Sequence, residues 1–367
     1  YCFIFMKEKI LKWMNEKTRL PIAGLDISDR SVKYLAFNPR DRNTLAGYGE
    51  IVLPEGMIIS GEIQEEDALA SILTKWIQGE GNMFRSYFFS VSLPEEKSFL
   101  RLIQLPKVRT EEVQNAIQWE LEANIPLPQE ELIYDYEVIE SSQTNLNHFD
   151  IVLTAFPKTL VESYTRVLKK SGIRLWALEL ESQAIVRASV AYARGRTGTI
   201  LVEIGYSRAS FIVFAGSTIF FTTTVELGGK VFEENIASNL KVSPEKAAAL
   251  KKEVGLNKRE QEGRVFMALV PAIAVLADEI HRSIEYYQSH TAHIHGAAQD
   301  VQEILLAGGD ANLFGLDTYL SVVLKIPVTR VDPFAAIGIT NSTLPLIPIK
   351  KSLAFVSSLG LALRDMR

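Results

Sequence analysis

Two acidic residues stand at the ends of apolar segments that lie far apart in the chain. Asp26 follows the apolar residues 22–25, and Glu203 follows residues 199–202. Two carboxylates that face one cleft suit a hydrated Mg²⁺ bound to phosphates, because magnesium accepts few direct carboxylates and keeps several of its waters. One acid would hold the water shell of the metal, and the other would orient a water for hydrolysis. We therefore predict that Asp26 and Glu203 bind Mg²⁺ through water.

Both acids belong to an internal repeat, in which residues 22–37 align without gaps on residues 199–214. In each copy an apolar strand reaches the acid, a short polar turn follows, and a second apolar strand leaves, as in a β-hairpin. Another candidate strand follows each copy, at residues 49–53 and 218–227. The duplicated start predicts two similar halves that face each other.

Small residues follow the predicted strands at places where a nucleotide would need them. Phosphate oxygens must approach backbone N–H groups closely, and helix N-termini add a favourable dipole. The candidate turns are residues 28–31, residues 205–207 and Gly308-Gly309, with Gly228-Gly229 before a predicted helix as a fourth. A single glycine pair is usually a plain turn, but three such turns in two halves rarely arise by chance.

Other side chains near these turns have potential chemistry. Glu203, Glu181 and Gln183 are the candidates for a catalytic role, although no spacing singles one of them out. Lys252 and its neighbour Lys251 end a predicted helix. They either offset the dipole of that helix or touch the base or ribose of a nucleotide.

Composition limits the classes of function. The chain has 367 residues, a net charge of −5 and a single cysteine, Cys2. Nothing in this charge favours nucleic acid, and no intrachain disulfide can form, which fits a reducing compartment. No apolar run reaches the roughly 18 residues that span a bilayer. Residues 7–16 carry a small apolar stripe that predicts a helix docked on the protein or, alternatively, touching a membrane surface.

Several familiar motifs are missing from the sequence. It contains no P-loop pattern, no G-x-G-x-x-G after its first strand and no G-x-S-x-G. A P-loop nucleotidase, a Rossmann dinucleotide site and an α/β-hydrolase are therefore not expected. His290 and His293 have the spacing of metal ligands, but no further ligand accompanies them, so we favour a solvated helix end.

Residues 96–157 predict a strand–helix–strand–strand module that is inserted in the first half. Its helix begins near Thr110 and ends before Pro126. Trp119 on this helix belongs either to the core of the module or to the wall of a peptide groove, and the core is the simpler interpretation. The apolar tail, residues 353–363, is interpreted as a core strand.

The paired hairpins and the segment Leu306-Ala-Gly-Gly-Asp310 resemble the phosphate-1, phosphate-2 and adenosine motifs of the actin, Hsp70 and sugar-kinase superfamily. Within it the chain resembles the PilM family of type IV pilus assembly proteins. The stretches that carry this resemblance are residues 53–63, 105–106, 125–126, 134–136, 331–334 and 359–364. The resemblance implies an α/β fold of the actin-like (ribonuclease H-like) duplicated type, with two lobes and an inserted SHS2-like subdomain 1C.

The resemblance also implies a division into subdomains. Subdomain 1A comprises residues 20–95 and 158–197 with a C-terminal return at 346–367, and subdomain 1C comprises residues 96–157. Subdomain 2A comprises residues 198–228 and 300–345, and subdomain 2B comprises residues 229–299.

As ligands the resemblance implies ATP or ADP with Mg²⁺. The nucleotide-binding residues expected on this basis are Asp26, Ser28, Asp29, Arg30, Ser31, Lys33, Glu203, Gly205, Ser207, Gly228, Gly229, Lys252, Gly308, Gly309 and Asp310. The implied partner is the cytoplasmic N-terminal tail of the inner-membrane protein PilN, held in a groove between 1A and 1C. Pilus motor ATPases are further implied partners, and a homo-oligomer is possible within the superfamily. The expected location is the cytoplasm, peripheral to the inner membrane through the partner.

The chain departs from the family pattern at its loops. Ser28, Asp29 and Arg30 replace small residues in the first turn, and Glu203 and Glu179 stand where aspartate is usual. Asp29 would place a negative charge beside phosphates, and Glu203 is one methylene longer than aspartate. We therefore expect nucleotide binding with weak or absent hydrolysis. The alternatives are a cell-division actin homologue of the FtsA type and a small-molecule phosphotransferase.

Overall fold

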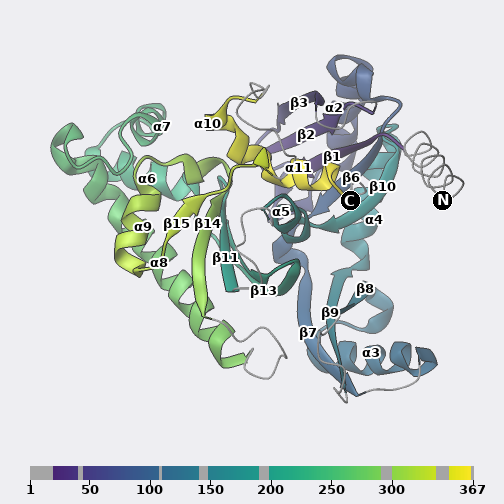
Figure 1. Ribbon diagram of the computed structural model, residues 1–367. Coiled ribbons are helices and arrows are strands. Elements are labelled where there is room, and N and C mark those ends of the chain that lie inside the picture. The colour runs from purple at the N-terminus through teal and green to yellow at the C-terminus, as the bar shows by residue number, and fades with distance from the viewer. Residues whose placement is uncertain are drawn as a thin grey trace, which may run out of the picture.

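The computed structural model describes residues 20–39, 44–106, 110–139, 148–189, 198–290, 300–335 and 347–364. These residues form two lobes, each built on a five-stranded mixed sheet, with a smaller module attached to the first lobe (Figure 1). The first sheet has the strand order β10-β6-β1-β2-β3. Its strands are β1 (Ile22–Ile27), β2 (Ser31–Phe37), β3 (Leu45–Val52), β6 (Phe88–Leu93) and β10 (Leu175–Leu180).

The second sheet repeats this arrangement with the order β15-β14-β11-β12-β13. Its strands are β11 (Gly198–Ile204), β12 (Ala209–Ala215), β13 (Thr218–Val225), β14 (Val301–Ala307) and β15 (Val328–Arg330). In both sheets the first strand runs antiparallel to the second and parallel to the strand on its other side. The duplication predicted from residues 22–37 and 199–214 is therefore confirmed.

The central strands are apolar because both faces of each sheet are covered. Leu25 in β1 and Leu201 in β11 are fully buried. Such near-continuous apolar runs are typical of strands with helices on both sides. The polar ends of these strands, where Asp26 and Glu203 stand, thus mark the edges of the cores.

The first lobe is completed by α2 (Glu66–Gln78), α4 (Lys158–Lys170) and α5 (Glu181–Ser189), with the short ribbon β4 (Ile58–Ile59) and β5 (Glu62–Ile63). Two 3₁₀ turns flank β6, namely η1 (Glu80–Phe84) and η2 (Glu95–Lys97). α2 and α4 contact each other, whereas α5 contacts β6 and β10.

The apolar tail of the chain is helical, which corrects the strand predicted for residues 353–363. It forms α10 (Ile349–Ser352), the 3₁₀ turn η7 (Leu353–Phe355) and α11 (Val356–Ala362), and it returns to the first lobe (Figure 1). Every residue of α11 is buried, against β1, β2, β6 and α5. A segment that is apolar on all sides has no periodicity, so its spacing does not separate a buried helix from a buried strand.

The inserted module is a three-stranded sheet with one helix. It comprises β7 (Phe99–Pro106), α3 (Thr110–Asn124), η3 (Gln129–Glu131), β8 (Leu132–Ile139) and β9 (His148–Pro157) in the strand order β7-β9-β8. Ile117, Leu121 and Ile151 belong to a core cluster that is separate from the main one. Trp119 is 73% exposed, so its assignment to this core is wrong.

The second lobe carries its own helical part, made of α6 (Gly229–Leu240), α7 (Pro244–Glu253), η4 (Glu260–Gly263) and α8 (Arg264–His290). Ser243 caps α7 by accepting the N–H of Lys246 at 3.3 Å, with Pro244 at the first helical position. This capping is a common helix start. η5 (Gly309–Asn312) and α9 (Leu316–Leu324) lie between β14 and β15.

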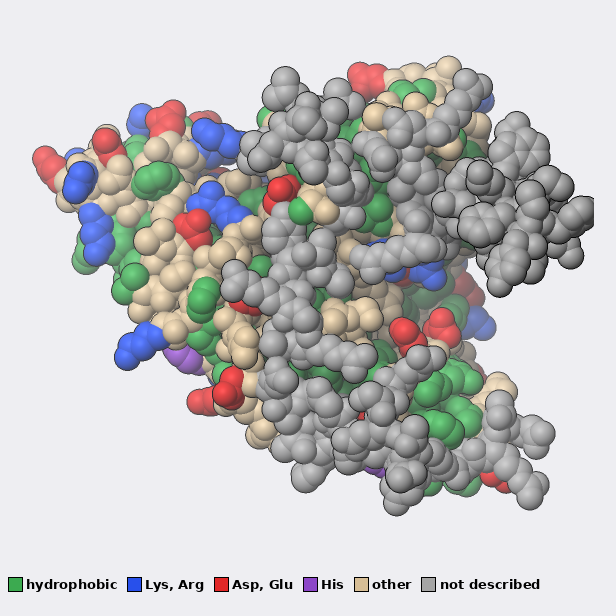
Figure 2. All heavy atoms as spheres, in the orientation of Figure 1, with side chains coloured by type: hydrophobic (Ala, Val, Ile, Leu, Met, Phe, Trp, Pro, Cys, Tyr) green, Lys and Arg blue, Asp and Glu red, His purple; other side chains and the backbone are tan. Residues whose placement is uncertain are grey.

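Some predictions fall outside these residues or are not tested by the fold. The helix predicted at residues 7–16 and the imidazole groups of His290 and His293 lie outside the described part of the chain. The limits of the subdomains stay predictions. Within the described ranges, no helix combines the length and apolar character needed to cross a bilayer. On the face in Figure 2, acidic and basic side chains are interspersed over the second lobe.

Candidate functional site

The ends of β1 and β11 bring Asp26 and Glu203 into one acidic cluster. Asp26 is 5% exposed, and its Oδ1 accepts a hydrogen bond from the hydroxyl of Ser92 at 2.9 Å. Burial and the nearby charge of Asp26 raise the pKa of Glu203 to about 8. The two hairpins therefore direct their acids toward the same space between the lobes.

Glu181, at the first turn of α5, joins this cluster. Burial and the charges of Asp26 and Glu203 raise the pKa of its carboxyl well above the ordinary range. Lys33 stands directly opposite Asp26 in the hairpin register and opposes the rise in the pKa of both glutamates. Its Nζ also donates to the Ser31 hydroxyl at 3.1 Å. Asp26, Glu181, Glu203 and Lys33 are called the central cluster below.

The central cluster fits a hydrated cation. Burial and the charge of Asp26 outweigh Lys33 and raise the pKa of Glu181 and Glu203, so further positive charge is needed there for both carboxyls to ionise. Among the described residues, no three histidine, cysteine or acidic side chains are grouped to hold a metal directly. A Mg²⁺ held mainly by phosphate oxygens and waters would fit here, and Asp26 and Glu203 would accept hydrogen bonds from those waters.

We expect Glu203→Gln to stabilise the metal-free protein in alkaline but not acidic buffer. The folded chain keeps the Glu203 proton up to about pH 8, whereas the unfolded chain releases it near the ordinary value of 4.5. Stability from this group is therefore full below pH 4.5 and falls as the pH rises toward 8.

One pKa unit corresponds to about 1.4 kcal/mol, so urea unfolding in EDTA should favour the Gln variant by about 2 kcal/mol or more at pH 9. The two proteins should differ little at about pH 4, where both the folded and the unfolded chain keep the proton of Glu203. An equal difference at both pH values would contradict the raised pKa of Glu203. Glu137→Gln, on the exposed edge of β8, is the matched control and should change stability little at either pH.

The predicted glycine turns serve two different purposes. At Gly308 φ is +89°, and a Cβ there would lie 2.3 Å from the carbonyl oxygen of Ile204. A Cβ on Gly229 would lie 2.2 Å from the Asp310 carboxylate, so both glycines allow close packing of protein on protein. Gly309 differs, because its exposed Cβ position has only Ala354 within 4 Å.

The N-terminus of α6 is bonded to the turn between β11 and β12. The N–H of Gly229 donates to the Gly205 carbonyl at 3.0 Å, and that of Lys230 donates to the Tyr206 carbonyl at 2.9 Å. A Cβ on Gly228 would lie 2.4 Å from the same Gly205 oxygen. These amides thus fix the second turn to α6.

Asp310 lies in an ion-pair network that sequence reasoning missed. Lys251 Nζ lies 2.5 Å from Asp310 Oδ1 and 2.8 Å from Glu233 Oε1, and its side chain is 7% exposed. Lys252 is exposed, and its contact with a nucleotide stays a prediction. The sequence does indicate that Lys251 is buried, because it lies four positions after Ala247 and so on the same, buried face of α7.

Asp29 and Arg30 face the opposite lobe. The Asp29 Oδ1 accepts the N–H of Gly61 at 3.0 Å and lies 3.7 Å from Arg208 Nη2, and the Arg30 guanidinium lies 4.4 Å from the ring centre of Tyr206. A cavity of about 690 Å³ opens beside these contacts. It is lined by residues of both turns and of α6, among them Asp29, Arg30, Tyr206, Ser207, Arg208 and Lys230.

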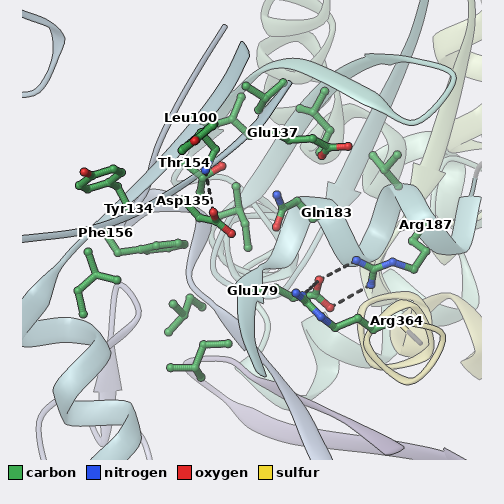
Figure 3. A pocket seen from close by; sticks show the side chains of 18 of the residues that line it. Leu100, Tyr134, Asp135, Glu137, Thr154, Phe156, Glu179, Gln183, Arg187 and Arg364 are labelled. Atoms are coloured by element: carbon green, nitrogen blue, oxygen red, sulfur yellow. Dashed lines mark hydrogen bonds and ion pairs between the residues drawn. The ribbon is translucent and has the colours of Figure 1, made fainter. Parts of the chain in front are cut away.

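A second cavity, of about 560 Å³, lies between the first lobe and the inserted module and is called the groove below (Figure 3). Residues 133–137 of β8 form one wall, and Gln183 and Arg187 of α5 line the opposite side. Gln183 thus belongs to the groove and not to the central cluster. On the groove floor, Glu179 is bonded to Arg187 and Arg364 at 2.7 and 2.6 Å.

Comparison with known proteins agrees with this architecture. The structure of a PilM-PilN type IV pilus biogenesis complex is similar with a TM-score of 0.79 and 22% identity, covering 95% of this chain and 99% of that one. MreB5 of Spiroplasma citri bound to ADP is similar with a TM-score of 0.55 and 13% identity, covering 95% and 96% of the two chains. The cell-division protein FtsA of Bacillus subtilis (strain 168) is 26% identical over 98 residues, which are 27% of this chain and 22% of that relative.

Two sheets of one topology with acids at the facing hairpins define an α/β protein of the actin-like class, with two lobes and an inserted module. Residues 24–366 match the family described as type IV pilus assembly protein PilM. The chain therefore belongs to the PilM family.

Proposed function

We propose that this chain is a cytoplasmic adaptor of type IV pilus assembly that holds the N-terminal tail of PilN in the groove. Membership of the PilM family and the likeness to a PilM-PilN complex support this partner. The observation that carries the proposal is the groove itself, whose wall is an open sheet edge. The adaptor would lie peripheral to the inner membrane through this partner and link the membrane complex to the pilus motor.

The wall of the groove is suited to an extended peptide. β8 pairs with β9 on one side, and no described strand pairs with its other side. Residues 133–137 all line the groove, although side chains of a strand alternate between its two faces. The edge of β8, and not one face of its sheet, therefore borders the groove. The N–H of Tyr136 donates to its neighbour Asp135 at 2.9 Å, which places this N–H on the open side. Outward backbone groups on a strand edge accept an added strand, which would replace the bond of this N–H to Asp135.

The floor of the groove adds polar recognition. Glu179 is 4% exposed and fixes both guanidinium groups, while the Arg364 side chain remains 35% exposed. Two arginines around one carboxylate leave a net positive charge. Because guanidinium groups only donate, we expect a carbonyl, amide or carboxylate oxygen of the tail to meet Arg364.

We expect a synthetic peptide of the PilN N-terminal tail to bind this chain and to raise its melting temperature. Tyr136→Pro removes one outward N–H from β8 and should weaken binding at least about tenfold relative to Tyr136→Ala, which keeps that N–H. Titration calorimetry with both variants measures this difference. Unchanged melting of the parent at saturating peptide would reject the partner, and equal affinities of the two variants would reject strand addition.

We further propose that the cleft between the lobes binds ATP or ADP with Mg²⁺ and hydrolyses it weakly or not at all. Asp26 and Glu203 would hold the hydrated metal, and the turns around Ser28, Ser207 and Gly309 would hold the nucleotide. A cavity of about 690 Å³, within the range of nucleotide-sized sites, is lined by Asp29, Arg30 and Ser207 of the two hairpin turns, whereas Asp26, Glu203 and Gly309 do not line it. Mg²⁺ would neutralise phosphate charge there.

The local match to FtsA supports a second candidate, a cell-division actin homologue. The groove discriminates between the two, because only the pilus function predicts binding of the PilN tail. A phosphotransferase activity has less support, since Gln183 lies in the groove and not beside the central cluster.

A further inference from the structure

Each of the two hairpin turns places an arginine against the opposite lobe. Arg208, in the turn between β11 and β12, reaches the first lobe, where its guanidinium contacts the carboxylate of Glu96 and lies 3.7 Å from Asp29. Arg30, in the turn between β1 and β2, lies over the ring of Tyr206 in the second lobe. Each turn is thus anchored on the opposite half of the molecule.

These contacts are shielded from water. The side chain of Arg208 is 14% exposed, and those of Asp29 and Glu96 are 16% exposed each. Opposite charges interact more strongly in such surroundings than at the surface. Removing one partner of a shielded pair is costly, because it leaves a charge that neither water nor protein neutralises.

The acidic side of the contact is held in place by bonds within the first lobe. The Asp29 carboxylate accepts the N–H of Gly61, and Glu96 belongs to η2, directly after β6. The neighbouring Glu95 accepts the N–H of Ser182 at 3.1 Å, which ties η2 to α5. The first lobe therefore presents a fixed pair of carboxylates to the incoming guanidinium.

We infer that Arg208, with Asp29 and Glu96, is a latch that holds the two lobes closed without any nucleotide. A nucleotide between matched turns would draw the lobes together by bridging them with phosphate oxygens. Here oppositely charged side chains of the protein already make that bridge. The inference goes beyond the adaptor function and does not depend on nucleotide binding, because closure is expected in nucleotide-free protein.

The latch is tested by the distance between the lobes in nucleotide-free protein. Spin labels on cysteines at Val52 and Val322, which are 71% and 73% exposed, report this distance in a Cys2→Ser background. We expect one narrow distribution for the parent. In Arg208→Gln we expect a second, longer component, with the open-to-closed ratio raised at least about tenfold.

Two further variants keep the test independent of folding defects. Glu96→Gln removes the other side of the latch and should produce the same longer component. Lys170→Gln removes the exposed pair with Asp67 within the first lobe and should leave the distribution unchanged. An identical distribution in Arg208→Gln, Glu96→Gln and the parent would overturn the latch. So would a parent that shows the longer component unless Mg·ATP is added.

Discussion

Gly360→Val is expected to destabilise the protein by at least about 3 kcal/mol, because the helix that carries Gly360 lies against backbone on two sides. A Cβ at this position would lie 1.8 Å from the carbonyl oxygen of Ala184 in α5. On the neighbouring strand, a Cβ at Gly24 would lie 1.9 Å from the Ser358 carbonyl oxygen. Main chain cannot rotate away as a side chain does, so α11 must move and expose buried apolar surface.

Urea unfolding of the nucleotide-free protein measures this loss, and Gly309→Val is the matched control. Its added Cβ meets only Ala354, at 3.7 Å, and its φ lies outside the left-handed region. We expect the control to change stability by less than about 1 kcal/mol. Equal losses at Gly360 and Gly309 would contradict the close crossing of α5 and α11.

Gly309→Trp is expected to abolish nucleotide binding while the chain stays folded. Gly309 begins the turn after β14 and has open space around its Cβ position, so an indole there lies in exposed space and not in the protein core. Gly308 is unsuitable for this test, because its φ of +89° and the nearby Ile204 carbonyl make any side chain destabilising. Fluorescence titration with a labelled ATP analogue measures the loss, which should exceed about a hundredfold.

Gly309→Ala is the control for the loss of backbone freedom and should bind nucleotide as the parent does. Asp26→Asn separates the metal from the nucleotide, because it keeps a group that can bond to Ser92 but removes the charge near Glu203. We expect this variant to lose the dependence of ATP affinity on Mg²⁺. Unchanged affinity in Gly309→Trp would place the nucleotide elsewhere or exclude it.

The repeat was the part of the sequence that predicted most of the fold. Residues 22–37 and 199–214 form equivalent hairpins, so one alignment predicted the central strands of both sheets and the meeting of Asp26 with Glu203. The spacing of apolar residues, every second one in strands and every third or fourth in helices, also located most surface elements. These elements have one face on the core and one face in solvent. The helices in residues 353–363 were not predicted, because every residue of α11 is buried and the segment has no polar face that would show a helical period.

The details of the candidate site were less predictable, since they depend on which lobe a side chain reaches. Asp29 and Arg30 contact Arg208 and Tyr206 of the other lobe, and their role beside phosphates stays a prediction. Local sequence contains no information about a partner that is almost 180 positions away. By contrast, helical spacing does place Lys251 on the buried face of α7, where it pairs with Asp310.

The inserted module has a core of its own, separate from that of the lobe beside it. The other face of its sheet packs on the lobes, because Leu100, Val152 and Phe156 belong to the main core, so a change in the spacing between β8 and α5 must alter this shared packing. A tail lodged there touches both bodies and favours the spacing at which it fits. Binding of the tail in the groove and the position of α3 relative to the first lobe would therefore be coupled. A protein that binds α3 would then change the dissociation rate of the tail.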